Sequence, residues 1–312
     1  MVFCSKCGKK VNSSDITCDN CGSLVINNNY FKLNKLENFN EIASAENLNI
    51  LKDNPLTSKE YDIILNNIYE MAKFYQSGEH PMNILDKIKA IVNSYVKVTY
   101  KSKGAELGSY SYNIIKIDDR LNSCDLISTL IHELTHHLFN EIFEQMLMYV
   151  WEVEKSDALE AYVSFMLGTN PVFLLMNEYC AHTVEGRFIP HGYQNYGSFN
   201  NILIEEFDLE KDKEAISFAL VMGNSIASDI INILEKFITH DLRMEIKTEF
   251  QRSYNKSPNY EEILLESDEI LDCEDKLKHM HIMLMSGISL ANMEDSNDLF
   301  SIIKNAYILN NS

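Results

Sequence analysis

Two histidines and a glutamate near the middle of the chain have the types and spacing of a hydrolytic zinc site. His132 and His136 lie four residues apart, and Glu133 directly follows the first histidine. On a helix this spacing is about one turn, so both imidazoles leave the same side and can bind one ion. Glu133 can then reach a water molecule on that ion without binding the metal itself. The pattern therefore predicts zinc at His132 and His136, with Glu133 as general base.

A helix must hold these residues, and the surrounding sequence predicts one. Leucine recurs at every fourth position, at Leu126, Leu130, Leu134 and Leu138. No proline or glycine interrupts residues 125–139, and an apolar stripe of this period favours a helix with one buried face. Two alternating segments upstream, residues 96–100 and 110–117, predict strands. The motif alone recurs by chance on surface helices, so this context is what favours a metal site.

A catalytic zinc site needs a third protein ligand, with one position left for water. The next histidine after His137 is His182, so the pattern in which a third histidine follows closely is absent. Glutamates on two predicted helices, residues 156–167 and 170–186, could supply a carboxylate instead: Glu160, Glu178 and Glu185. Most glutamates are solvated on helix surfaces, so the residues alone leave the choice open.

The segment around Glu178 resembles the gluzincin metallopeptidases. It reads Asn177-Glu178-Tyr179-Cys180-Ala181, and the second helix of the compact bacterial gluzincins carries a glutamate, an aromatic residue and an alanine in this order. The resemblance covers residues 95–200. It implies a zincin-like fold, a peptide substrate and Glu178 as the third zinc ligand, with Glu160 and Glu185 as the alternatives.

One turn after Glu178, this chain differs from the larger gluzincins. They often carry an aspartate there that bonds to a ligand histidine, whereas this chain has His182. We expect His182 to act in catalysis, either by contacting the metal ligands or by donating to the oxyanion of a tetrahedral intermediate. The glycine-rich and aromatic loop of residues 186–199 offers further donors: Arg187, His191, Tyr193 and Tyr196.

The N-terminal segment predicts a second, structural zinc site. Two Cys-x-x-Cys pairs, each followed by glycine, are formed by Cys4, Cys7, Cys18 and Cys21. Four thiolates close a tetrahedral shell and leave no position for substrate. The segment resembles the short zinc ribbons at the N-termini of many bacterial proteins. Since it is too short to bury a core, we expect its metal to hold it together and its surface to meet a protein partner.

The overall composition predicts a soluble cytoplasmic protein. Lys and Arg number 27 against 46 Asp and Glu, for a net charge of −19. A surface this acidic repels phosphate backbones, so we expect no nucleic-acid partner. The sequence shows no charged-then-apolar signal at its start and no apolar run of about eighteen residues, so we expect neither export nor a membrane span.

These features together predict an α+β protein that is mostly helical. We expect a zinc ribbon at residues 1–25, a linker with irregular helix at residues 26–57, a zincin-like domain at residues 58–204 and a helical C-terminal part at residues 205–312. The zincin-like domain should combine a small antiparallel sheet with the active-site helices. In the C-terminal part, apolar periodicity predicts several helices, one of them at residues 260–271.

The expected chemistry is hydrolysis of a peptide bond by a zinc metallopeptidase acting on a peptide or protein substrate. Glu133 would take a proton from the attacking water and deliver it to the leaving amine. The resemblance to gluzincins implies that the substrate is a peptide, whereas the residue spacing predicts only a hydrolytic zinc site. The alternative is a non-catalytic binding or regulatory module that keeps the zincin fold and meets its partners through the ribbon.

Overall fold

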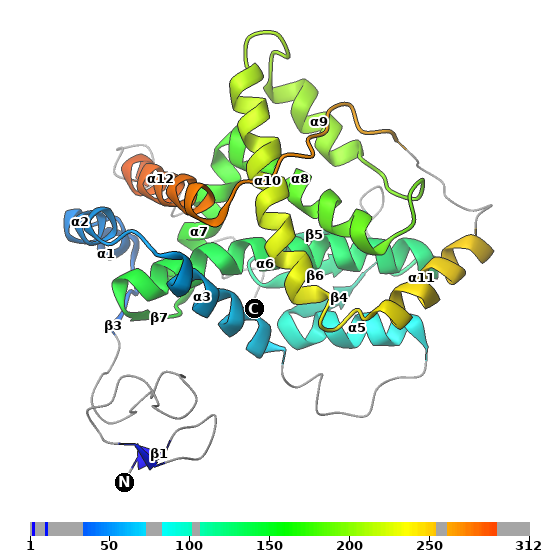
Figure 1. The fold of residues 1–312 in the computed structure, drawn as a ribbon, viewed down its shortest axis with the longest axis horizontal. Coiled ribbons are helices and arrows are strands. Elements are labelled where there is room, and N and C mark those ends of the chain that lie inside the picture. The colour runs from blue at the N-terminus through cyan, green and yellow to red at the C-terminus, as the bar shows by residue number, and fades with distance from the viewer. Residues whose placement is uncertain are drawn as a thin grey trace.

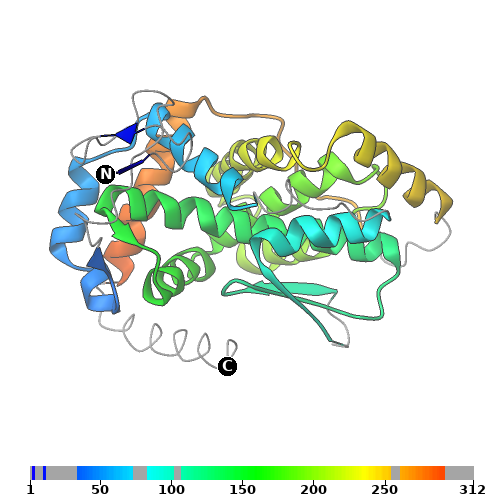
Figure 2. The same ribbon diagram turned by 90° about the horizontal axis from the view of Figure 1, so that it is seen from below.

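Helices make up most of the residues that the computed structural model describes, which are residues 2–3, 10–11, 34–72, 83–101, 107–253 and 261–291. A small three-stranded sheet lies along one flank of the helical body (Figure 1, Figure 2). The prediction of a mostly helical α+β protein is therefore confirmed, while the zincin-like fold stays a prediction.

Helix α6 (Ser123–Trp151) carries the His132–His136 motif and runs through the middle of the fold (Figure 2). Its first turn is capped by the Asn122 side chain, which accepts hydrogen bonds from the main-chain N–H groups of Cys124 and Asp125. Most of its length is buried on every side, because helices and the sheet surround it. A helix enclosed in this way is held rigidly, as a metal-binding element needs to be.

The sheet consists of β4 (Lys97–Tyr100), β5 (Gly108–Ser111) and β6 (Ile114–Ile117), in the order β4-β6-β5. The expected single strand over residues 110–117 is wrong, since the chain reverses at Tyr112 and Asn113. Both have positive φ, 45° and 55°, which suits the tight turn of a twisted hairpin. The expectation of a fully antiparallel sheet is also wrong, because β4 pairs with β6 in parallel. Strand β5 is left as the edge beside α6.

The second helical arm of the site is formed by α7 (Asp157–Thr169) and α8 (Pro171–Phe188), which meet at an angle of 98°. Asn170 caps α8 and Pro171 begins it, as the sequence predicts. Helix α10 (Lys213–Leu234) packs on α8 closely at Gly223, where an added Cβ would lie 2.7 Å from the Met176 carbonyl oxygen. Glycine is thus required for the approach of α10 to the turn of α8 that precedes Glu178.

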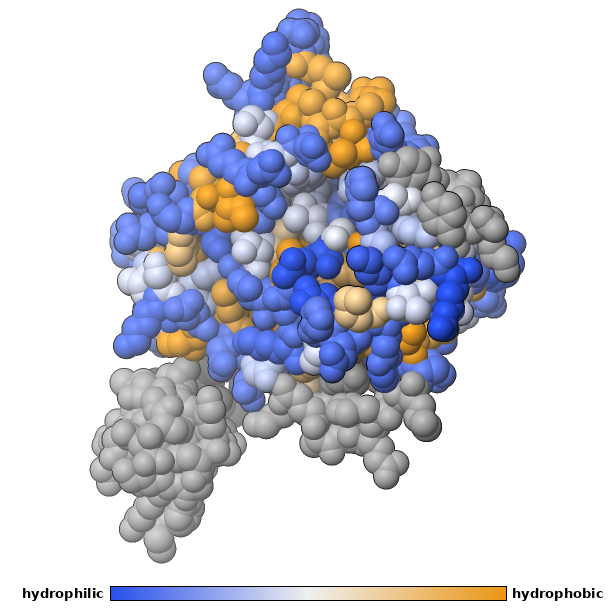
Figure 3. All heavy atoms as spheres, turned by 45° about the vertical axis from the view of Figure 1, so that its right-hand side comes forward, coloured by the Kyte–Doolittle hydropathy of each residue, from blue (hydrophilic) through white to orange (hydrophobic). Residues whose placement is uncertain are grey.

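Helix α10 is long and apolar enough to cross a membrane, but 67% of its most apolar stretch is buried inside the protein. It therefore forms part of the core, which fits a soluble protein. The surface seen in Figure 3 is largely hydrophilic, in keeping with the acidic composition. An apolar patch lies at the tip of the molecule, where α9 (Gly197–Glu206) ends and Ile204 and Leu209 are exposed. A cytoplasmic location stays a prediction.

The stretch over residues 261–272 is extended rather than helical, so the helix expected at residues 260–271 is wrong. Its carboxylates repel one another, and side chains of the neighbouring helices bind its main chain instead. Tyr179 bonds the N–H and C=O of Ser267 at 2.8 and 3.0 Å, and Asn200 bonds Glu262 and Leu264 at 2.8 and 3.1 Å. This strap crosses α8 and α9 and continues into α12 (Cys273–Ala291).

The remaining described helices are α1 (Phe39–Ile42), α2 (Ala45–Asp53), α3 (Ser58–Met71), α5 (Ile84–Tyr95) and α11 (His240–Arg252). Of these, α2, α3 and α5 pack against α6, α1 packs against α7 and α11 packs against α5. Two short strands, β3 (Asn34–Lys35) and β7 (Val153–Glu154), pair in parallel and tie the N-terminal part to the end of α6. Near the N-terminus, β1 (Val2–Phe3) pairs with β2 (Lys10–Val11) in an antiparallel manner. The four ribbon cysteines lie outside the described residues.

A buried ionic cluster fixes α6 against α7. Lys155 lies 2.6 Å from the Glu141 carboxylate and 2.9 Å from that of Glu144. Burial raises the pKa of Glu144 to about 8, assisted by the negative charges of Glu141 and Glu160 and opposed by Lys155. The pKa of Glu141 is lowered, because Lys155 and His137 outweigh its burial. One ammonium group thus holds one carboxylate ionised while its neighbour stays protonated.

We predict that Glu144→Gln flattens the loss of stability that wild type shows as the pH rises from about 5 to 8. Folded Glu144 keeps its proton up to about pH 8, whereas the unfolded residue loses it near its ordinary value. Unfolding therefore releases a proton, and stability falls between about pH 5 and 8 by at most about 1.4 kcal/mol per pH unit. Urea unfolding across this range measures the slope. The exposed Glu154→Gln should keep the wild-type slope, and an equal slope in Glu144→Gln contradicts the assignment.

Candidate metal centre

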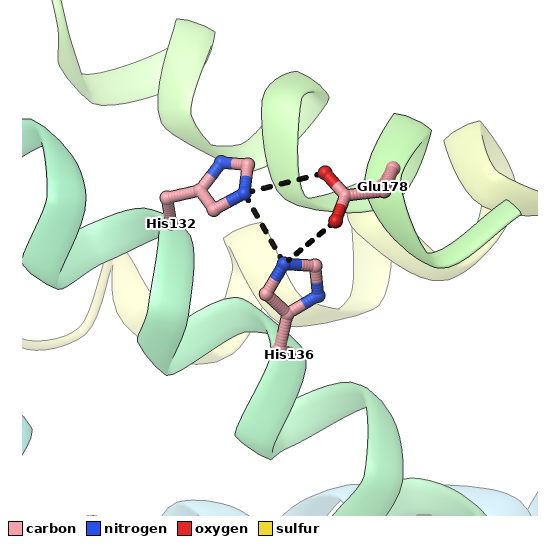
Figure 4. Close-up of side chains that lie close together, drawn as sticks. All are labelled: His132, His136 and Glu178. Atoms are coloured by element: carbon pink, nitrogen blue, oxygen red, sulfur yellow. Dashed lines mark hydrogen bonds and ion pairs between the residues drawn. The ribbon is translucent and has the colours of Figure 1, made fainter. Parts of the chain in front are cut away.

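Three side chains from α6 and α8 converge at the wall of a cleft of about 1080 Å³ (Figure 4). The Nε2 atoms of His132 and His136 are 3.1 Å apart. Each lies 3.5 Å from an oxygen of Glu178, His132 from Oε2 and His136 from Oε1. A tetrahedral zinc ion with bonds of about 2.0–2.1 Å separates its ligand atoms by roughly 3.3 Å. The two nitrogens and the carboxylate therefore lie close enough to share one zinc ion, and they have the chemistry of a zinc site.

The outer nitrogens of both histidines are held by side chains of α8. The Nδ1 of His132 lies 3.3 Å from Glu185 Oε2, and the Nδ1 of His136 lies 3.0 Å from Asn177 Oδ1. Ser128 donates a further hydrogen bond to Glu185 Oε1. A proton on each Nδ1 leaves the Nε2 lone pair free for a metal, because a neutral imidazole carries only one N–H. Glu185 and Asn177 thus select the tautomer that binds a metal.

The electrostatics of the cluster favour a cation among the donors. Burial raises the pKa of Glu178, but His136 and His132 outweigh it and leave this pKa well below its usual value. Burial lowers the pKa of His136 to about 4, so its ring is neutral at pH 7. The pKa of His132 is lowered by burial, yet Glu178 and Glu185 raise it well above the usual value. The carboxylates therefore stabilise positive charge at this point.

The structure brings Glu178 to the two histidines and places the two alternative glutamates elsewhere. Glu160 is buried on α7 beside Glu144, in the cluster around Lys155. Glu185 forms a second group with His132 and His182, but it faces Nδ1 of His132 rather than Nε2. An ion bound by that group would take the lone pair of His132 Nδ1. The proton of His132 would then lie on Nε2 and point at the Nε2 of His136. Among the described residues, the group with Glu178 is therefore the better zinc site.

His182 lies between the two carboxylates of α8 and does not face the cleft as a free donor. Its ring packs on that of His132, with centroids 4.6 Å apart, and only 3% of its side chain is exposed. Its Nδ1 lies 3.3 Å from Glu185 Oε2 and its Nε2 lies 3.2 Å from the Ser198 hydroxyl. Of the two expected roles, these contacts favour support of the metal ligands over donation to an oxyanion.

Glu133 lines the same cleft as His132 and His136 and is only 6% exposed. Strand β5 passes directly over it at Gly108. An added Cβ there would lie 2.8 Å from Glu133 Oε1 and 2.5 Å from Thr129 Cγ2. Glycine thus lets the edge strand approach the proposed general base more closely than any side chain would allow.

The other candidate donors over residues 186–199 are dispersed, and Arg187 lies in the last turn of α8. Arg187 pairs with Glu235 at 2.6 Å, and Tyr196 donates to the Gln194 side chain at 2.9 Å while its ring packs on His182. His191 is exposed, and only Tyr193 lines the cleft. Tyr193 is therefore the one loop residue of the four that can contact a substrate.

Several residues of the centre are absent from the sequence prediction: Ser128, Asn177, Ser198 and Gly108. Asn177 directly precedes Glu178, and Ser128 lies one turn before His132, so helical spacing could have indicated both. Ser198 and Gly108 come from elements whose distance to the site is set by tertiary packing. No sequence signal marks them.

Comparison with protein-family models, with curated proteins and with solved structures finds no match to this chain.

We predict that Glu178→Gln removes one metal ion per chain. A neutral amide replaces the ligand charge, so the count by atomic emission after dialysis should fall from two ions, with the ribbon included, to one. Glu160→Gln is the matched control and should keep both. Glu185→Gln should keep the ion with an affinity lower by about 10–100-fold. Equal counts in wild type and Glu178→Gln would contradict the assignment.

Proposed function

We propose that this protein is a zinc-dependent peptidase, with zinc held by His132, His136 and Glu178. The observation that carries the proposal is the convergence of the two Nε2 atoms and the Glu178 carboxylate on the wall of an open cleft that also contains Glu133, with each nitrogen 3.5 Å from one carboxylate oxygen. Three protein ligands leave a fourth position for water, as catalytic zinc sites do. Zinc bound here would polarise water and the substrate carbonyl group.

The residues of this chain supply the proton transfers and the orientation. Glu133 takes a proton from the attacking water molecule and passes it to the leaving amine nitrogen. Glu185 and Asn177 keep the ligand imidazoles in the required tautomer. Tyr193 lines the cleft and can contact a substrate, while its hydroxyl oxygen is buried.

The substrate that fits this cleft is an extended peptide with neutral or basic side chains. Strand β5 is an edge strand of the three-stranded sheet and lines the cleft, so a peptide can pair with its main chain beside Glu133. Asp125 and Glu261 also line the cleft, and no lysine or arginine does so among the described residues. Acidic peptides would be repelled by these carboxylates.

The ribbon cysteines Cys4, Cys7, Cys18 and Cys21 complete the proposal. We propose that they hold a second, structural zinc ion and that this segment recruits a protein partner or substrate. Four thiolates leave no open position, so this ion takes no part in the hydrolysis.

We predict that Glu133→Gln lowers the turnover of peptides by roughly 10²–10⁴-fold while the metal content stays at the wild-type value. The amide keeps the shape of the side chain but cannot accept the proton. Cleavage of an unstructured peptide library, followed by mass spectrometry, measures the effect, and chelation followed by zinc addition shows metal dependence. If wild type and Glu133→Gln cleave equally, or neither cleaves, the peptidase proposal is wrong and the binding module replaces it.

We predict that Gly108→Ala lowers kcat/KM by roughly 100-fold with zinc retained, because the new methyl group displaces the Glu133 carboxylate. Gly168→Ala is the matched control. Gly168 lines the same cleft, but an added Cβ would meet no atom within 4 Å, so this variant should keep wild-type kinetics. Wild-type activity in Gly108→Ala would show that β5 does not constrain the base.

A further inference from the structure

The third ligand, Glu178, is itself held by a serine from another helix. Ser198 lies in the first turn of α9, and its hydroxyl is 2.8 Å from Glu178 Oε2. The same hydroxyl is 3.2 Å from Nε2 of His182, whose ring is buried. Ser198 therefore connects the metal ligand on one side with the His182–Glu185 pair on the other.

The direction of these two hydrogen bonds follows from the groups involved. The ionised Glu178 carboxylate can only accept, so the single proton of the Ser198 hydroxyl must point at Oε2. The serine oxygen is then left as an acceptor, and it takes the N–H of His182 Nε2. The two hydrogen bonds therefore have the same direction: His182 donates to Ser198, and Ser198 donates to Oε2 of Glu178.

We infer that Ser198 is a positioning residue that restricts Glu178 to one metal-binding oxygen, Oε1. This inference rests on the zinc centre proposed above. Each carboxylate oxygen lies 3.5 Å from one ligand nitrogen, Oε1 from His136 Nε2 and Oε2 from His132 Nε2. Only Oε2 also accepts the Ser198 hydroxyl, so Oε1 is the oxygen that keeps its lone pairs for the metal. A carboxylate that binds through one oxygen preserves the fourth position for water, while one that binds through two would fill it.

The main chain around Ser198 is anchored well enough for this role. The Gly197 N–H donates to the Asn195 side chain at 2.9 Å. One turn into α9, Asn200 is bonded to the main chain of the strap on both its donor and acceptor sides. The serine therefore reaches Glu178 from a fixed backbone, and its hydroxyl needs no rearrangement to meet the carboxylate.

Two variants of Ser198 and one matched control test the inference. Ser198→Ala removes the hydroxyl, Ser198→Thr keeps it, and Asn201→Ala changes a neighbouring cleft residue of the same helix. Zinc affinity is measured by competition with a chelating dye. The zinc ion whose affinity is compared is the one that Glu178→Gln is expected to lose. In the cobalt-substituted proteins, the visible absorption of each form minus that of Glu178→Gln reports the coordination number of this site alone.

We expect Ser198→Ala to weaken zinc binding about 10-fold or more and to lower the intensity of the cobalt bands, as a second carboxylate oxygen enters the coordination shell. Ser198→Thr should restore both, and Asn201→Ala should match wild type. If Ser198→Ala has the zinc affinity and cobalt spectrum of wild type, the positioning role is wrong but the zinc centre stands. The same conclusion follows if Ser198→Thr does not restore the affinity and the spectrum. Equal metal counts in wild type and Glu178→Gln overturn the zinc centre itself.

Discussion

The structure depends on balancing two carboxylates, the buried Glu185 and the partly buried Glu178, against three imidazoles at the junction of α6 and α8. An unpaired charge is costly there. His132 faces Glu185 through Nδ1, Ser198 donates to Glu178, and a divalent cation in the proposed zinc centre would compensate further. In that proposal, metal binding and the packing of the two helices are coupled, so a change at either carboxylate would affect both.

The placement of Glu178 is decided by the whole fold, although the residue is identified by a local motif. Helix α10 presses on α8 through Gly223, and the strap over residues 261–272 binds Tyr179, the residue next to Glu178. Ser198 approaches from α9. Elements distant in the sequence thus hold the ligand from several sides, which gives the C-terminal helices a role in positioning the site.

The sequence predicts those parts of the site that depend on helical spacing. His132, Glu133 and His136 follow from one turn of an apolar helix, and Asn170–Pro171 marks the start of α8. The strap at residues 261–272 could not be predicted, because its apolar periodicity favours a helix while its main chain is bound by distant side chains such as Asn200. The sequence does not predict the turn at Tyr112, because neither glycine nor proline marks it. Such features depend on tertiary contacts, which local patterns do not contain.

The histidine at position 182 explains why Glu185 is needed. Residues 178, 182 and 185 share one face of α8, spaced by one turn and then a further turn. His182 fills the space beside His132 with its ring, so a carboxylate for Nδ1 of His132 has to come from the next turn. Glutamate has the length to reach it at 3.3 Å. His182 also carries a donor that a carboxylate lacks, and it directs that donor to Ser198. His182 therefore leaves the contact with His132 Nδ1 to Glu185 and itself contacts Ser198, which donates to Glu178.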